Sequence, residues 1–134
     1  MASPDSATAF APGHVTSLFS VHRRDDPAQT GSRGAGVATS HGVTTTVAPA
    51  EETAVTLDGG PATIDPVERV LDALGVSARV TCETPLPIGA GFGVSGAAAL
   101  GTAIAADAAF GVGHSENELV TLAHVAEVES GTGL

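Results

Sequence analysis

The feature that most constrains the fold is a glycine-rich segment followed by a long apolar run, residues 85–110. Glycine alternates with other residues at Gly89, Gly91 and Gly93, and the following residues are mostly alanine and other apolar types. Glycine lacks a Cβ, so it permits positive φ and lets a ligand approach the backbone closely. Alanine is the strongest helix former. The sequence therefore predicts a glycine loop that opens a buried helix over residues 94–110.

The start of a helix behind such a loop is a suitable place for an anion. Its first N–H groups have no partner within the helix, and the positive end of the helix dipole lies behind them. The usual anion at such a site is a phosphate. The alternative on local pattern is a glycine-rich turn packed against a buried helix. We therefore predict phosphate binding by residues 89–96.

Two common phosphate loops do not fit this segment. Residues 91–96 match G-x-G-x-x-G, but the segment after the helix reads as another helix and not as a strand that ends in an acid, as a dinucleotide fold requires. A Walker A loop requires a lysine, and the chain contains none. A dinucleotide-binding oxidoreductase domain stays as an alternative.

The composition is strongly acidic. The 134 residues carry 15 Asp and Glu against 5 Arg, for a net charge of −10 at pH 7. Such a surface disfavours nucleic acid, whose binding depends on Lys and Arg. Abundant acid without lysine is typical of salt-adapted proteins and indicates a halophilic archaeon as the source. A single cysteine, Cys82, excludes an intrachain disulfide and indicates a cytoplasmic protein.

One stretch has the length of a membrane span. Residues 88–106 carry no charge, and about 20 apolar residues are enough to cross a bilayer. Most of them are glycine and alanine, however, with few large apolar side chains to drive insertion. The first ten residues also lack the basic head and apolar core of a signal peptide. We therefore predict no membrane partner.

The remaining elements alternate in type. Asp65 as N-cap, Pro66 and the terminating Gly75 predict a helix, and a capping box of Ser115 and Glu118 predicts the start of the last one. We expect a turn at residues 11–14 and a polar loop at 22–33. Alternating and β-branched residues predict strands at 7–10, 15–21, 36–47 with a break at His41-Gly42, 53–57 and 77–84. The fold class is therefore α+β, a β-sheet packed against helices.

The last helix carries a second group of polar residues. His124 and Glu127 lie three residues apart, so they share one face. A glycine turn at residues 131–133 follows. Each residue has an ordinary alternative role, Glu127 as a solvated helix carboxylate and His124 as a surface or core histidine. A carboxylate is nevertheless a preferred ligand of Mg²⁺.

The segment Pro87-Ile-Gly-Ala-Gly-Phe-Gly-Val-Ser-Gly-Ala97 resembles the phosphate loop of the GHMP kinases, roughly P-x-G-x-G-L-G-S-S-A. It departs from that pattern at Val94 and Gly96, which replace a serine and an alanine. The resemblance implies the N-terminal, ATP-binding domain of the GHMP kinase fold (ribosomal protein S5 domain 2-like) over residues 1–134. It also implies that Ser95 and Glu127 bind Mg²⁺. The implied ATP-binding residues are Pro87, Gly89, Ala90, Gly91, Gly93, Ser95, Gly96 and Ala97.

Within the family, residues 11–19, the second glycine cluster at 31–36 and the His124–Glu127 pair resemble the archaeal pantoate kinases. That resemblance implies phosphoryl transfer from ATP to the hydroxyl of pantoate, giving 4-phosphopantoate for coenzyme A biosynthesis. Ser32 and His124 are implied at the substrate site, and Arg33 is a candidate because pantoate carries a carboxylate. The alternatives are a GHMP kinase for mevalonate, homoserine or shikimate, and a non-catalytic acidic binding domain. A homodimer is the candidate assembly for this protein.

Members of this family are longer than this chain. They have an aspartate soon after the second glycine turn and a C-terminal domain beyond it, whereas the chain ends at Leu134. We therefore predict that the chain is a fragment whose catalytic aspartate lies beyond Leu134 and whose C-terminal domain is absent. A fragment without that domain is expected to lack activity in isolation.

Overall fold

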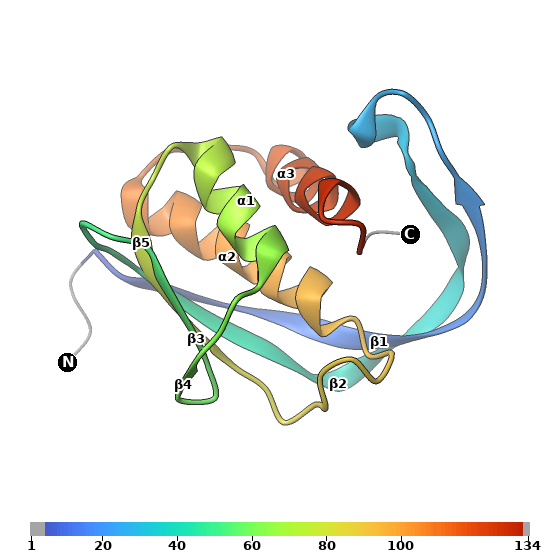
Figure 1. Cartoon of the computed structure of the whole chain (residues 1–134), viewed down its shortest axis with the longest axis horizontal. Coiled ribbons are helices and arrows are strands. Elements are labelled where there is room, and N and C mark those ends of the chain that lie inside the picture. The colour runs from blue at the N-terminus through green and yellow to red at the C-terminus, as the bar shows by residue number, and fades with distance from the viewer. Residues whose placement is uncertain (1–4, 133–134) are drawn as a thin grey trace.

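A five-stranded sheet with three α-helices on one face makes up the part of the chain that the computed structural model describes, residues 5–132 (Figure 1). The strands are β1 (Ala7–His22), β2 (Gly31–Pro49), β3 (Ala54–Leu57), β4 (Gly60–Pro61) and β5 (Ala78–Glu83). The helices are the short 3-10 helix η1 (Pro27–Gln29) and the α-helices α1 (Asp65–Leu74), α2 (Val94–Phe110) and α3 (Glu116–Glu129). The predicted α+β class is therefore confirmed.

The sheet is mixed and has the strand order β1-β2-β5-β3-β4. Neighbouring strands are antiparallel except for β3 and β5, which are parallel. Parallel neighbours need a crossover connection, and here α1 lies in the segment that joins them. The chain then leaves the centre of the sheet through β5 and enters the glycine loop.

Helix α2 packs on the sheet and also contacts α1 and α3. Its small side chains allow a close approach: a Cβ at Gly101 would lie 2.7 Å from Oγ1 of Thr45 in β2. Ala98 and Ala106 are fully buried in the same core cluster as Val43 and Val47, so the predicted buried helix is confirmed. Within residues 5–132, no helix is long and apolar enough to cross a membrane.

The turn predicted at residues 11–14 and the break predicted at His41-Gly42 are wrong. The structure keeps residues 11–14 within β1, where a register shift between Pro12 and His14 absorbs the irregularity. Strand β2 runs without a break through His41-Gly42 and already begins at Gly31, inside the predicted loop. A Cβ at Gly34, Gly36 or Gly42 would clash with a backbone carbonyl of β1. These glycines therefore serve close strand pairing and not chain reversal.

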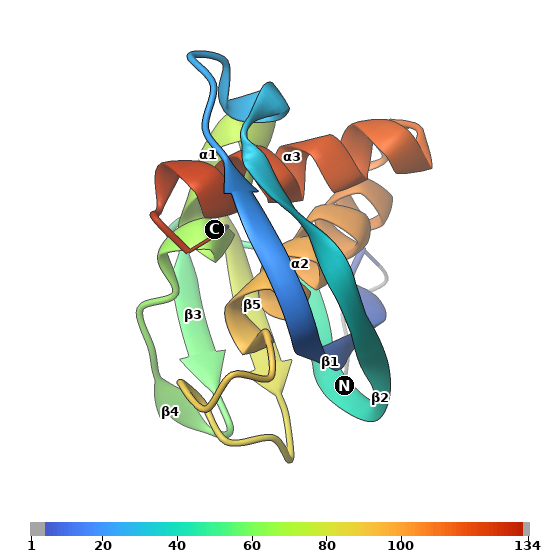
Figure 2. The ribbon, with the colours of Figure 1, turned by 90° about the vertical axis from the view of Figure 1, so that its right-hand side faces the viewer.

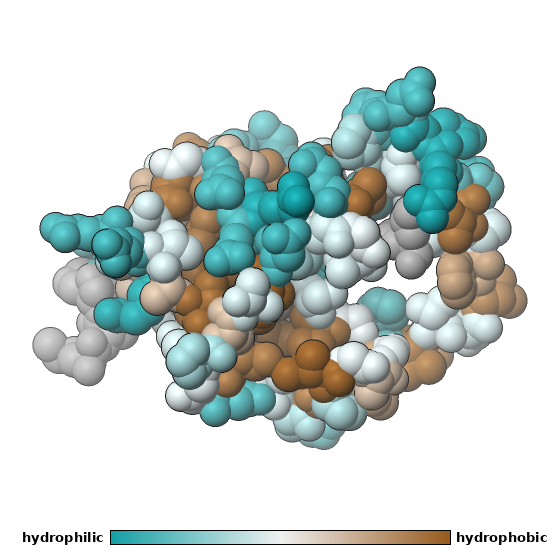
Figure 3. Space-filling view, in the orientation of Figure 1, coloured by the Kyte–Doolittle hydropathy of each residue, from teal (hydrophilic) through white to brown (hydrophobic). Residues whose placement is uncertain are grey.

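The outer halves of β1 and β2, residues 15–22 and 31–38, form a two-stranded arm that rises beside the helices (Figures 1 and 2). Nearly all of its residues are exposed. Its large exposed apolar side chains are Val15, Leu18, Phe19, Val21 and Val37. Figure 3 shows a hollow between this arm and the rest of the molecule.

The helix ends follow local chemistry with one exception. Ser115 and Glu118 form the predicted capping box of α3, and Gly75 ends α1 with a φ of 70°. The N-cap of α1 is Ile64, so the prediction that Asp65 caps this helix is wrong. The carboxylate of Asp65 instead accepts a hydrogen bond from Nε of Arg69 at 2.8 Å, one turn further along the helix.

Candidate functional site

The N-terminus of α2 has no side-chain cap. Its N-cap is Gly93, with a φ of 68°, and no side chain accepts a hydrogen bond from the first turn. The N–H of Ala97 donates to the carbonyl of Gly93 at 3.0 Å and closes that turn. The earlier N–H groups of the helix are therefore available to an anion, which the helix dipole also favours.

The glycines before the helix have different roles. Gly89 and Gly91 have φ values of 73° and 90°, and a Cβ at either position would meet nothing within 4 Å. They are needed for the path of the loop and not for packing. Gly93 is different, because a Cβ there would overlap the ring of His14. The open space around Gly89 and Gly91 favours the ligand-binding hypothesis over the packed turn.

Ser95 in the first turn of α2 lies opposite Glu127 in the last turn of α3. The Ser95 hydroxyl donates to Oε1 of Glu127 at 3.4 Å, and Glu127 is only 8% exposed. A Cβ at Gly96 would lie 2.6 Å from the same carboxylate oxygen. Glycine in place of the alanine of the family pattern thus makes room for the Glu127 side chain.

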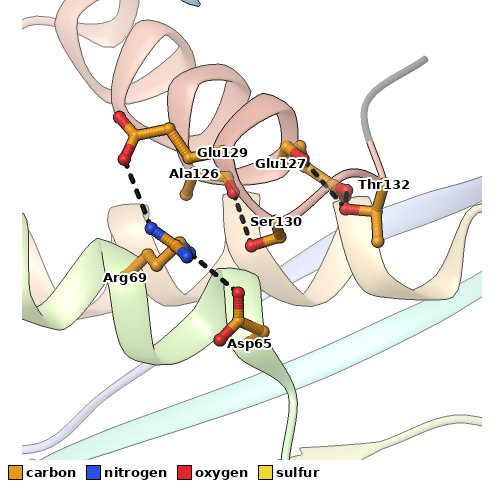
Figure 4. Close-up of polar contacts among 7 residues, drawn as sticks. All are labelled: Asp65, Arg69, Ala126, Glu127, Glu129, Ser130 and Thr132. Carbon is orange, nitrogen blue, oxygen red and sulfur yellow. Dashed lines mark hydrogen bonds and ion pairs between the residues drawn. The ribbon is translucent and has the colours of Figure 1, made fainter.

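Thr132, just after α3, holds the other side of this carboxylate (Figure 4). Its hydroxyl hydrogen-bonds Oε2 of Glu127, and its N–H donates to the Glu127 carbonyl at 2.9 Å. The turn that allows this passes through Gly131, with a φ of 77°; Gly133 lies outside the described residues. Thr132 is not among the residues predicted from the sequence. The available signal was a hydroxyl beside the glycine that ends a carboxylate-bearing helix.

A pocket of about 500 Å³ joins this pair to the arm. Predicted site residues in its lining are Gly91, Gly93, Ser95, Gly96, Ser32, His124 and Glu127. Thr16 and Phe19 of the arm, and Val120 and Ala123 of α3, are also part of the wall. Three segments far apart in the sequence, the glycine loop, the arm and α3, therefore meet at one pocket.

The other predicted site residues lie outside this lining. Pro87, Gly89 and Ala90 are exposed in the loop, and Ala97 is buried in the core. Arg33 is exposed on the arm next to Ser32, and successive side chains of a strand point to opposite faces. The roles predicted for these five residues stay predictions.

His14 is a further pocket residue that the sequence analysis missed. Its backbone N–H donates to the carbonyl of Phe92 at 2.9 Å, and this hydrogen bond joins β1 to the glycine loop. Its Nδ1 lies 3.3 Å from Oγ1 of Thr16. Since the chain has no lysine and no arginine lines the pocket, the ionisable nitrogen groups in the lining are the imidazoles of His14 and His124. The signal was the histidine directly after Pro12-Gly13.

The oxygen atoms of Ser95 and Glu127 suit a hard cation. Mg²⁺ commonly takes one or two protein oxygens and completes its shell with phosphate oxygens and water. Among residues 5–132, no group of three or more His, Cys, Asp or Glu converges as a metal cage. The donor set of Ser95 and Glu127 therefore fits a magnesium ion shared with a phosphate ligand.

Residues 63–134, more than half of the chain, match the GHMP kinases N terminal domain. The chain therefore belongs to the GHMP kinase family, as predicted. Pantoate kinase from Methanospirillum hungatei is 33% identical over 140 residues, which cover 95% of this chain and 47% of that protein. Pantoate kinase from Methanocaldococcus jannaschii is 29% identical over 130 residues, covering 93% and 47%. The chain thus spans about half the length of the curated relatives it matches.

Solved structures agree with this assignment. A phosphotransferase related to the CoA biosynthesis pathway superimposes with a TM-score of 0.85 at 30% identity, over 96% of this chain and 48% of that one. Mevalonate diphosphate decarboxylase from Staphylococcus aureus has a TM-score of 0.68 at 17% identity, over 96% and 43%. The second similarity shows the shared fold alone. The predicted fold, that of the N-terminal GHMP domain, is confirmed.

Proposed function

We propose that this chain is the ATP-binding part of a kinase that transfers the γ-phosphoryl group of ATP to the hydroxyl of pantoate. The observation that carries the proposal is the pairing of Ser95 with Glu127 at the uncapped start of α2. The pantoate kinases among its relatives support the acceptor, and the product would be 4-phosphopantoate, a precursor of coenzyme A.

The nucleotide phosphates would be bound mainly by backbone groups. The N–H groups of residues 89–96 belong to the glycine loop and the first turn of α2, and the pocket lining offers no arginine to share this role. Ser95 and Glu127 would hold Mg²⁺ against the phosphates, and the bound ion supplies positive charge that the protein side chains do not. Thr132 orients the Glu127 carboxylate for that purpose.

The acceptor would occupy the part of the pocket between the arm and α3. Ser32 offers a hydroxyl there, and His124 an imidazole, one turn before Glu127. Arg33 lies outside the pocket lining and stays a candidate for the carboxylate of pantoate on its charge alone.

The nucleotide site can be tested by titrating this chain with ATP in a calorimeter, with and without Mg²⁺. We expect binding that strengthens with Mg²⁺, and we expect Ser95→Ala and Glu127→Gln to remove most of that strengthening. Glu129→Gln is the matched control, because Glu129 lies two residues further on, is exposed, and pairs with Arg69 at 3.3 Å (Figure 4). Absence of nucleotide binding in the folded chain would favour the non-catalytic acidic domain.

The acceptor is tested separately, in the complete protein that carries this chain. Initial rates with pantoate, mevalonate, homoserine and shikimate would be compared at saturating Mg-ATP. We expect pantoate to give the highest kcat/KM. Faster turnover of any of the other three would replace pantoate as the proposed acceptor. The proposal for the nucleotide site would still stand.

A further inference from the structure

The tip of the arm, residues 23–30, returns to the body of the molecule at α3. Nε2 of His124 lies 2.5 Å from the carbonyl oxygen of Thr30, and η1 contacts the same helix. A carbonyl can only accept a hydrogen bond, so Nε2 must carry the proton. Within residues 5–132, no other hydrogen bond joins the arm or its tip to α3. In the described part of the chain, this is therefore the hydrogen bond that joins the arm to α3, beside the packing of η1 on the same helix.

The carbonyl that accepts this bond sits on a well-braced turn. The Thr30 hydroxyl accepts the N–H of Arg24 at 2.8 Å and lies 2.8 Å from the Arg24 carbonyl, to which it can donate. The N–H of Thr30 donates to the carbonyl of Pro27 at 3.3 Å. Thr30 is also only 6% exposed, on an arm whose residues are otherwise mostly exposed. The turn thus holds its carbonyl in one direction, toward α3.

Gly31 makes room for the imidazole. A Cβ at this position would lie 3.0 Å from Cε1 and 3.5 Å from Nε2 of His124. The backbone of Gly31 is not in the left-handed region, unlike that of Gly89, Gly91 or Gly93. Its conformation is one that other residues adopt, so the need for glycine here comes from the ring of His124.

We propose that Thr30 and Gly31 are positioning residues for the acceptor: the hydrogen bond from His124 to the Thr30 carbonyl sets the distance between arm and helix at which Ser32 and His124 can contact one molecule. Ser32 directly follows Gly31 and lines the pocket from the arm side, together with Phe19. With Nε2 committed to Thr30, only Nδ1 of the ring remains for a ligand. This inference rests on the proposed function, and it adds that His124 acts on the acceptor through the arm as well as by contact.

The bond itself is tested without any activity measurement. In the ¹⁵N-labelled chain, the imidazole signals of His124, assigned by their loss in His124→Gln, should show the form protonated at Nε2. Gly31→Ala should change these signals, since its methyl group would displace the ring. Thr30→Val, which keeps the carbonyl but loses the bracing hydroxyl, is the second variant should Gly31→Ala fail to fold. A ring protonated only at Nδ1 would overturn this inference and would leave the proposed function standing.

The positioning role is tested by kinetics in the complete protein. Gly31→Ala should raise the KM for pantoate between about threefold and tenfold, the range that corresponds to one lost hydrogen bond, and leave the KM for ATP unchanged. Ser20→Ala is the matched control, because it removes a 2.8 Å contact with His22 on the arm that does not reach α3; both constants should stay the same. An unchanged pantoate KM, in a variant whose His124 signals show the bond broken, would overturn the inference. A wild-type protein that shows the bond but does not phosphorylate pantoate would overturn the proposed function, and the positioning role with it.

Discussion

Helices α2 and α3 pack against each other and each follows a loop, yet they begin in opposite ways. At α3, Ser115 accepts the N–H of Glu118, and Glu118 accepts the N–H of Ser115 at 2.9 Å. The hydrogen bond from the Ser115 N–H also lowers the pKa of the Glu118 carboxyl. At α2, Gly93 offers no side chain, and the first turn has no side-chain acceptor.

The difference separates a helix start whose N–H groups are satisfied within the chain from one whose N–H groups are left for the proposed phosphate ligand. A capped terminus satisfies its N–H groups with side chains of the same chain and is stabilised in the absence of any ligand. An uncapped terminus leaves that stabilisation to the molecule that binds there, so its stability increases with ligand concentration. The following predictions test this contrast, from the largest expected effect to the smallest.

The largest effect is expected from Glu127→Gln. The side chain keeps its size but loses the charge beside Ser95, so kcat of the complete protein should fall about 100-fold or more, as for other groups that stabilise a transferred charge. Steady-state kinetics with saturating Mg-ATP measures this. The same change at Glu129 should leave kcat nearly unaffected; equal losses in both variants would contradict the role of Glu127.

Gly96→Ala and Gly101→Ala should separate the two functions within α2. The first places a methyl group 2.6 Å from Oε1 of Glu127, so Mg-ATP affinity should fall about tenfold, equivalent to ~1.4 kcal/mol. The second places one 2.7 Å from Oγ1 of Thr45 in the core, where overpacking costs about 1–3 kcal/mol of stability. Calorimetry and urea unfolding of both variants measure the two quantities. Nucleotide binding lost equally in both variants would argue against the assignment of Gly96.

Ser115→Ala should weaken folding without weakening nucleotide binding. Loss of this N-cap should lower the free energy of unfolding by about 1 kcal/mol. Urea unfolding measures the loss, and ATP titration under native conditions serves as the control. A clear loss of Mg-ATP affinity in this variant would show that the two helix starts are not independent.

The smallest effect concerns the turn between the two helices. The backbone N–H of His114 lies 3.0 Å from the Asp107 carboxylate, and this hydrogen bond, with the His114 imidazole, lowers the pKa of Asp107. Because folding lowers the pKa of this carboxyl, its ionised form stabilises the folded protein at any pH above the pKa of the unfolded state, which is about 3.9. This contribution to stability is lost as the pH falls through the lower pKa of the folded state. Melting temperatures at neutral and acid pH should show a smaller acid-induced drop for Asp107→Asn than for wild type. An identical drop would show that this carboxyl contributes no pH dependence.

The parts of the fold that depend on neighbouring residues in the chain could be predicted from the sequence. The capping box at Ser115, the end of α1 at Gly75 and the apolar run of α2 are examples. The lengths of β1 and β2 could not be predicted, because turn-forming residues there are overridden by pairing with a distant strand. Gly34 and Gly42 look like turn residues until the carbonyls of β1 are seen beside them.

The candidate site shows the same division. Ser95 and Glu127 were predicted from their motifs, and the structure places the Ser95 hydroxyl 3.4 Å from Oε1 of Glu127. His14 and Thr132 were missed because their contacts depend on three segments meeting in space. The departure at Gly96 was noticed in the sequence, but its cause, the carboxylate of Glu127 above it, belongs to the tertiary structure.

The arm also determines how fast different amides of one strand pair exchange with solvent. From Ala7 to Ala11, β1 pairs with the part of β2 that lies beneath α2, where Val43 and Val47 are fully buried. From Val15 onward the same ladder has both faces in water, so it opens at a lower free energy. Its far end is fastened again at Thr30. Protection from hydrogen exchange should therefore be high at the base, lowest in the middle and partly restored at the tip, so the arm opens from its centre and not from its end.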